Sequence, residues 1–168
     1  MNLYENFSML REILDIVGDP REGLPEEVFE FAASIVPMVN VDLLVRDKQS
    51  RILLARRDDK FSGSVWHIPG GIVRFKETLL HRVDQVAMKE IGQPVFTTGI
   101  PLAVNEILSD HQERGHFISF LYECRLQETL IIEEKTEWKH GDLKWFGECP
   151  PDFIPCQFNV YEKYFYHK

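Results

Sequence analysis

Residues 68–92 read IPGGIVRFKETLLHRVDQVAMKEIG, and this segment is the most informative part of the chain. Its apolar residues recur at the spacing of an amphipathic helix, about 100° per residue, which predicts a helix over Glu77–Ile91. Three polar side chains, Arg82, Gln85 and Lys89, are expected to face solvent. The stripe that is expected to face the core consists of Leu79, Leu80, Val83, Val86, Ala87 and Ile91.

Glu90 is the exception to this pattern, because it projects inside the apolar sector. A carboxylate that faces a core is costly unless it is paired, hydrogen-bonded or bound to a cation. Glu90 is therefore expected either to neutralise a buried arginine or lysine or to hold a metal ion. The helical pattern alone leaves both interpretations open.

The composition is that of one folded domain. The chain has 168 residues, of which 44% are hydrophobic, 12% aromatic and 27% charged, so it can bury a substantial core. The formal net charge of −8 argues against a general affinity for nucleic acid, which depends on neutralising phosphates. In such an acidic protein a polyanionic small molecule needs a local positive pocket.

Neither the cysteines nor the N-terminal sequence points to export or to a membrane. The three cysteines are an odd number without CxxC spacing, which argues against a disulfide framework or a zinc site. The segment MNLYENFSMLREILDIVGDP carries charges throughout, so it is expected to be neither a signal peptide nor a membrane span. We therefore expect a cytoplasmic protein without a membrane partner.

The order of the predicted elements indicates an α+β fold. The segments NVDLLVR and RILLARR predict two strands joined by the polar turn Asp47–Ser50 as a hairpin, and DDKFSGSV predicts a loop. Helices packed on an antiparallel or mixed sheet would give an α+β fold or an α/β/α sandwich. Later strands are expected at 94–100, 102–108, 115–126 and 142–147, with a closing helix over 159–168.

Two helices are expected before the first strand. Apolar residues recur at helical spacing from Leu3 to Val17, and Pro25 followed by two glutamates suits the first turn of a second helix. Neither helix holds a cluster of reactive residues, so we assign residues 1–36 to an N-terminal helical extension. These helices exceed what the sheet requires, which leads us to expect a homodimer.

The segment after the Gly-Gly pair resembles the Nudix box. That box has the pattern Gx5Ex7REUxEExGU, where U is aliphatic, and it is often preceded by a sequence like WHIPGG, as here. The resemblance implies that residues 37–168 form a Nudix hydrolase domain, an α/β/α sandwich with a mixed β-sheet. The residues in register with the box are Gly71, Glu77, Ala87, Glu90 and Gly92.

The box is reduced in this chain. Where the family has Arg-Glu the chain has Gln85 and Val86, and where the family has Glu-Glu it has Lys89 and Glu90. Magnesium binds oxygen ligands, usually one or two carboxylates together with waters and substrate phosphate. One remaining carboxylate can hold one ion but not a cluster, which disfavours pyrophosphate cleavage assisted by several ions.

A reduced box of this kind resembles the GDP-mannose mannosyl hydrolase branch of the family. Members of that branch break the bond between the sugar carbon and the diphosphate, which releases the free sugar and a nucleoside diphosphate. The resemblance implies a nucleotide sugar as substrate and Mg²⁺ as cofactor, with Mn²⁺ as an alternative. Substitution at carbon needs less charge neutralisation at phosphorus, so one ion can suffice.

Motifs place the site residues of that branch on this chain. VNVDLLV places Asp42 at a catalytic carboxylate near the sugar, and LLARRDDKFSGSVWHIPGG places Arg57 at an arginine that contacts substrate. HGDLKW places His140 at the proposed general base, for which an imidazole is suited near neutral pH. The metal ligands correspond to the Gly70 carbonyl and to Glu90, which favours the metal interpretation of that carboxylate.

Four positions depart from the branch. Two of its arginines become Ile72 and Gln85, and a histidine near the sugar falls at Ile107. A glutamine metal ligand becomes Lys139, and a protonated ammonium group cannot coordinate magnesium. Either Lys139 turns away and water completes the metal shell, or its charge pairs with Glu90 or with the diphosphate.

Other residues near the Gly-Gly turn are candidates for substrate contacts. Arg74 is expected to replace the arginine missing at Ile72, and His67 is expected to be structural. Phe61 and Trp66 are candidates to line a base or sugar pocket. The cations expected to bind the diphosphate are Arg56, Arg57, Lys60 and Arg74.

Three functions follow from these observations. The first is hydrolysis of a nucleoside-diphosphate sugar at the sugar carbon, with one Mg²⁺ on Glu90. The second is a conventional Nudix pyrophosphohydrolase, with metal ligands recruited from Asp84, Glu77 or Glu106. The third is a catalytically degenerate module that binds a nucleotide sugar, which the lysines at 89 and 139 would suit.

Overall fold

The computed structural model describes residues 3–59, 62–110 and 114–166, with side chains described from residue 8 onward. The helices are α1 (Leu3–Val17), α2 (Glu26–Ile35), α3 (Leu79–Val86), the π-helical turn η1 (Ala87–Ile91), α4 (Pro155–Tyr161) and α5 (Lys163–Tyr166). The strands are β1 (Met38–Val45), β2 (Ile52–Asp59), β3 (Gly63–His67), β4 (Gly70–Ile72), β5 (Val95–Phe96), β6 (Ala103–Leu108), β7 (His116–Leu126) and β8 (Leu143–Phe146).

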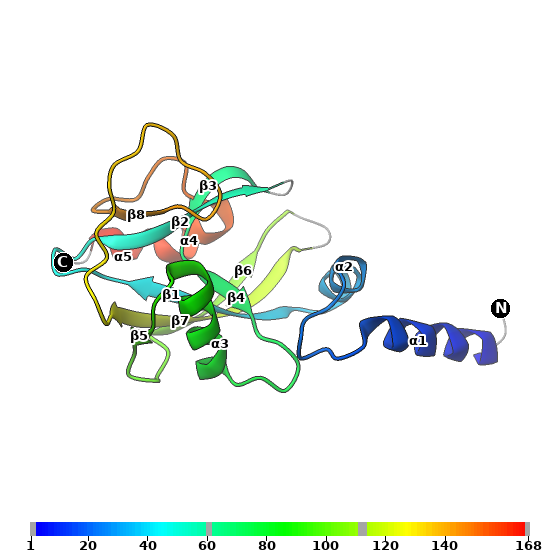
Figure 1. Cartoon of the computed structure of the whole chain (residues 1–168). Coiled ribbons are helices and arrows are strands. Elements are labelled where there is room, and N and C mark those ends of the chain that lie inside the picture. Colours follow the sequence, from blue (N-terminus) through cyan, green and yellow to red (C-terminus); the bar gives the residue numbers. More distant parts are fainter. Residues whose placement is uncertain (1–2, 60–61, 111–113, 167–168) are drawn as a thin grey trace.

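The strands form two sheets. In the larger sheet the order is β4-β1-β7-β5, and β6 also pairs with β7; in the smaller sheet the order is β3-β2-β8. β1 and β7 are parallel and the other pairs are antiparallel, so the larger sheet is mixed. Helix α3 lies on one side of the larger sheet, and α4 and α5 lie on the other side (Figure 1). The expected α+β fold with a mixed sheet is confirmed.

The predicted hairpin between the first two long strands is wrong. A single bridge, between Arg46 and Ile52, joins β1 to β2, and the two strands then enter different sheets. The reason is that residues 41–45 of β1 are all buried. A strand buried on both faces lies inside a sheet with a neighbour at each edge, and here β4 and β7 occupy both edges of β1.

The helix after the Gly-Gly turn differs from the expectation in two ways. It begins at Leu79 and not at Glu77, because the hydroxyl of Thr78 accepts from His81 N–H as the N-cap. It ends in the π-helical turn Ala87–Ile91, where Gly92 N–H donates to the Ala87 carbonyl over 3.0 Å. Leu80, expected to face the core, is 45% exposed.

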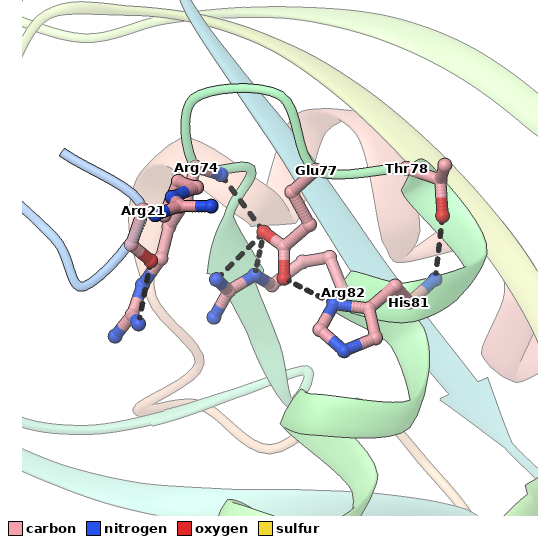
Figure 2. Close-up of polar contacts among 6 residues, drawn as sticks. All are labelled: Arg21, Arg74, Glu77, Thr78, His81 and Arg82. Atoms are coloured by element: carbon pink, nitrogen blue, oxygen red, sulfur yellow. Dashed lines mark hydrogen bonds and ion pairs between the residues drawn. The ribbon is translucent and has the colours of Figure 1, made fainter. Parts of the chain in front are cut away.

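Arg82 differs most from the prediction, because its side chain was expected to face solvent and is only 9% exposed. Its Nε donates to Glu77 over 2.7 Å, and Glu77 also accepts from the Arg74 N–H over 2.9 Å (Figure 2). His81 Nδ1 lies 2.8 Å from the other carboxylate oxygen. Burial favours the neutral acid, but these hydrogen bonds outweigh it and hold the pKa of Glu77 below its usual value.

The two N-terminal helices are found where they were expected, although their role and the domain boundary at residue 36 stay predictions. Figure 1 shows α1 projecting away from the sheets. Several of the large apolar side chains on α1 and α2 are exposed, among them Met9, Leu10, Leu14, Ile16, Phe31 and Ile35. Within the described part of the chain, no helix combines the length and the apolar character needed to cross a lipid bilayer.

We predict that Glu77→Gln lowers the free energy of unfolding by about 3 kcal/mol at pH 7, because it leaves the buried Arg82 charge without its counter-ion. Since the folded-state pKa of Glu77 is lowered, the stabilisation exists above the unfolded-state pKa of about 4.3. It disappears as the pH falls through the folded value. Urea denaturation of both proteins between pH 2.5 and 7 measures this.

Asp84→Asn is the matched control, because Asp84 is an exposed carboxylate on the same helix. Its unfolding free energy should stay within about 0.5 kcal/mol of the wild type at every pH. A loss in Glu77→Gln that does not change with pH would mean that the charge of Glu77 contributes nothing.

Candidate active site

A cavity of about 400 Å³ lies between β2, the turn at Gly70, the π-helical turn and the loop before β8. Five of the seven site residues predicted from the sequence line it, which are Arg56, Arg57, Gly70, Glu90 and His140. The other lining residues are Ala55, Asp59, His67, Lys89 and Gly141. The structure thus brings together residues that are up to 84 positions apart (Arg56 to His140).

Glu90 lies at the end of this cavity with most of its surface covered. Burial raises the pKa of Glu90 to about 7, while its interaction with the Gly70 backbone opposes that shift. Its Oε2 atom is buried and has no hydrogen-bond partner among the described residues. Glu90 also forms no ion pair with any described arginine or lysine, so the buried ion-pair interpretation receives no support.

An inward-facing carboxylate oxygen that lacks a donor is suited to a divalent cation. Divalent ions such as Mg²⁺ prefer hard oxygen ligands. The described residues contain no group of three or more His, Cys, Asp or Glu side chains placed to hold an ion. The site therefore fits one ion on Glu90 better than a cluster of ions.

The side chain of Lys139 does not approach the Glu90 carboxylate. It is exposed and is not among the side chains that line the cavity, and the backbone N–H of Lys139 donates to Asp142 Oδ2 over 2.7 Å. Of the pairings expected for this residue, the one with Glu90 is therefore not present, and the one with the diphosphate stays a prediction. Lys89 lies in the cavity instead, where its charge favours the ionised form of Glu90.

The three predicted arginines have different surroundings. Arg57 lines the cavity and donates to Asp59. Arg56 also lines it, but its guanidinium donates to Asp152 over 2.5 Å and to Ser64 over 2.8 Å and lies 5.1 Å from the centre of the Trp66 ring. Arg56 is therefore largely occupied by protein contacts.

The structure does not bring Arg74 to the cavity. Its guanidinium donates to the Arg21 carbonyl over 3.1 Å and so ties the N-terminal segment to the loop before α3 (Figure 2). The arginine missing at Ile72 is thus not replaced by Arg74. Lys60 and Phe61 lie outside the described residues, and Trp66 packs in the core against Trp138 and Phe146.

His140 is exposed and held by one hydrogen bond. The Asp58 N–H donates to its Nδ1 over 3.2 Å, so in the neutral ring the proton is on Nε2. In this conformation the free nitrogen of His140 is a donor. A general base needs a free lone pair, so that role requires His140 to release Asp58.

Asp42 lies in a second cavity of about 300 Å³ that shares Arg57, His67 and Gly70 with the first. It is 1% exposed, and burial raises its pKa to about 6. Tyr161 OH donates to it over 2.5 Å, and Ser119 donates to the same oxygen. A Cβ at Gly70 would overlap this carboxylate, which explains the glycine at that position.

His67, which the sequence led us to expect as a structural residue, lines both cavities. Its Nδ1 lies 2.9 Å from the Ile68 carbonyl, which can only accept, so Nδ1 carries the proton and Nε2 is an acceptor. Burial lowers the pKa of His67 to about 4, so the ring is neutral at pH 7. The only available signal was its place directly before the IPGG turn, which positions both cavities.

A model of the NUDIX domain family matches residues 36–148, which is most of the chain. The chain belongs to the NUDIX domain family. The mixed-sheet Nudix fold and the hydrolase class expected from the sequence are thereby confirmed. As a Nudix hydrolase, the protein acts on nucleoside-diphosphate derivatives.

The individual proteins that resemble this chain share less than a third of their residues with it. The low-salt glycan biosynthesis protein Agl8 of Haloferax volcanii is 28% identical over 132 residues, which cover 76% of this chain and 81% of Agl8. A MutT NUDIX hydrolase from Burkholderia pseudomallei has a TM-score of 0.57 and 19% identity, covering 76% of this chain and 98% of that structure. A UDP-X diphosphatase has a TM-score of 0.58 and 18% identity, covering 97% of this chain and 78% of that structure. The two structures share the fold with this chain.

We predict that the affinity for Mg²⁺ depends on the protonation of Glu90. Because burial raises its pKa to about 7, the ion must displace a proton below that pH. The apparent association constant should rise about tenfold per unit from pH 5.5 to 7 and level off above about pH 8. Isothermal calorimetry across this range measures it.

Glu90→Gln should bind Mg²⁺ more weakly and without this pH dependence. Asp84→Asn, an exposed carboxylate outside both cavities, should behave as the wild type. Equal affinities for wild type and Glu90→Gln would remove Glu90 from the set of metal ligands.

Proposed function

We propose that this Nudix hydrolase cleaves nucleoside-diphosphate sugars by attack of water at the sugar carbon, as in the GDP-mannose mannosyl hydrolase branch. The observation that carries the proposal is the single buried carboxylate of Glu90, with an unpartnered oxygen, in a cavity that also holds Arg57 and Lys89. Those charges suit one divalent ion and one diphosphate.

The metal site would consist of few protein ligands. Glu90 would hold Mg²⁺ or Mn²⁺ together with the Gly70 carbonyl, and water or substrate oxygens would complete the shell. The ion would neutralise charge on the leaving diphosphate. A leaving group that departs with its anhydride bond intact needs less neutralisation than a phosphorus centre under attack, which agrees with a reduced box.

The side chains would divide the remaining work. Arg57, and to a lesser degree Arg56, would bind the diphosphate. His140 would take the proton from the attacking water after releasing the Asp58 N–H. Asp42, with its pKa of about 6, is largely ionised at pH 7 and would stabilise positive charge that develops on the sugar ring.

Similarity to a glycan-related protein supports a sugar-containing substrate. Agl8 is named for glycan biosynthesis and aligns with 76% of this chain. By contrast, the conventional pyrophosphohydrolase would need several carboxylates around the ions, and Glu77 is fully engaged by Arg74, His81 and Arg82. This engagement leaves Glu77 unable to serve as a recruited ligand.

A second candidate, binding of a nucleotide sugar without turnover, is favoured by one observation. The Nδ1 atom of His140 already accepts from the Asp58 N–H, so His140 is not free to act as the base in this conformation. Turnover by the purified protein would exclude this candidate.

The test is a screen of nucleotide sugars with Mg²⁺ in ¹⁸O-labelled water. Attack at carbon gives a free sugar that contains ¹⁸O and an unlabelled nucleoside diphosphate. Attack at the anhydride gives a sugar phosphate and a nucleoside monophosphate, with the label in one of the phosphates. The second outcome would overturn the proposal in favour of a conventional pyrophosphohydrolase.

We predict that His140→Ala lowers kcat by about 10²–10⁴, the usual contribution of a general base. KM should change little, because the proton is removed only as water attacks. His116→Ala, which removes an imidazole paired with Glu106 at the surface, is the control and should keep the wild-type rate. A loss below threefold in His140→Ala would exclude His140 as the base.

The exposed apolar side chains of α1 and α2 lead us to propose a homodimer. Isolated helices of about 15 residues are marginal in water, so α1 is expected to gain its stability from a partner. Light scattering after gel filtration should give twice the 19.7 kDa chain mass at micromolar concentration. A 19.7 kDa particle under these conditions would contradict the homodimer.

A further inference from the structure

The two adjoining cavities differ in charge. The first is lined by Arg56, Arg57 and Lys89 and suits phosphate oxygens. The second is lined by the buried carboxylate of Asp42 and by two arginines, Arg57, which it shares with the first cavity, and Arg114, which lies 3.9 Å from Glu30. It therefore offers a phosphate fewer cations than the first. The second cavity therefore suits the uncharged part of a ligand whose phosphates occupy the first.

The remaining lining of the second cavity combines neutral polar groups with apolar walls. Asn40 and Gln157 supply amides, while Ile72, Ile107 and Phe117 supply apolar surface. Both amides donate to Asp42, and the Gln157 carbonyl accepts from the Ile68 N–H, so the apolar residues are the main surface left for a ligand. Such a surface matches the C–H groups on the face of a sugar ring.

One wall of this cavity comes from outside the Nudix family match. Phe29 belongs to α2, which precedes residue 36, and it lines the second cavity. The guanidinium of Arg114, which follows β6 and also lines the cavity, lies 4.8 Å from the centre of the Phe29 ring. Arg114 is also 3.9 Å from Glu30, so this one residue contacts two side chains of α2. Figure 1 shows α2 beside the end of the β6–β7 hairpin.

We propose that α2 forms part of the substrate-binding site. In this proposal Phe29 contacts the sugar ring of a bound nucleotide sugar and thereby determines the affinity for that sugar. The inference rests on the proposed function. It assigns part of the N-terminal helical extension to substrate selection, whereas the sequence pattern indicated only packing. Phe29 would contact the apolar face of the ring while the diphosphate lies near Arg57.

The test compares ligands with and without the sugar. Phe29→Ala should weaken binding of GDP-mannose about three- to tenfold, the usual effect of losing one aromatic contact, and leave binding of GDP within twofold of the wild type. UDP-glucose and UDP form a second pair. Calorimetry in metal-free buffer measures all four dissociation constants without turnover.

Phe31→Ala is the matched control, because Phe31 lies on the same helix and is 57% exposed. It should bind all four ligands as the wild type does, and Phe29→Tyr should retain most of the affinity. Because GDP and GDP-mannose share everything but the sugar, a loss of the whole fold cannot weaken one and spare the other. Thermal melting of each variant confirms that it is folded.

Each other outcome is informative. Equal weakening of GDP and GDP-mannose would overturn the proposal, because it would mean that Phe29 contacts the base or only supports the fold. No weakening of either ligand would overturn it as well, and the proposed function would stand. If the wild type bound no nucleotide sugar while it hydrolysed other nucleotides, the proposed function would fail and this inference with it.

Discussion

The ion pair between Glu77 and Arg82 sets the start of α3, and the position of the candidate active site follows from it. Glu77 holds the Arg74 N–H, His81 and Arg82 at once, so the loop after the Gly-Gly turn closes onto the first turn of the helix. From that fixed start the helix runs to its π-helical end, where Glu90 faces the cavity. Arg82 thus holds this loop against the helix, whereas position 85, where the family box has an arginine, is Gln85 here.

A second constraint comes from the central strand. Residues 41–45 of β1 are buried on both faces, which places Asp42 inside the protein between β4 and β7. The carboxylate is tolerated because Tyr161, Ser119 and Asn40 donate to it and because Gly70, its partner on β4, has no side chain in the way. Gly70 therefore contributes to both cavities, since it lines each of them and its lack of a side chain makes room for Asp42.

The features set by local sequence could be predicted, whereas the features that depend on tertiary contacts could not. Helical periodicity correctly identified Glu90 as an inward-facing carboxylate, and motif spacing brought Arg57, Gly70 and His140 to one cavity. The prediction of a β1–β2 hairpin was wrong because two strands that are adjacent in the chain need not pair with each other when one of them is buried on both faces. Arg82 was placed on the wrong side because periodicity ignores a counter-ion that arrives from a loop.

Histidine roles were the least predictable, because they depend on which ring nitrogen carries the proton. His140 matched a general base by spacing, yet the Asp58 N–H occupies its Nδ1 lone pair. His67 matched nothing, yet its Nδ1 is bound to a carbonyl and its Nε2 is an acceptor between the two cavities. For His140 to act as the proposed base, the Asp58–His140 hydrogen bond must first break.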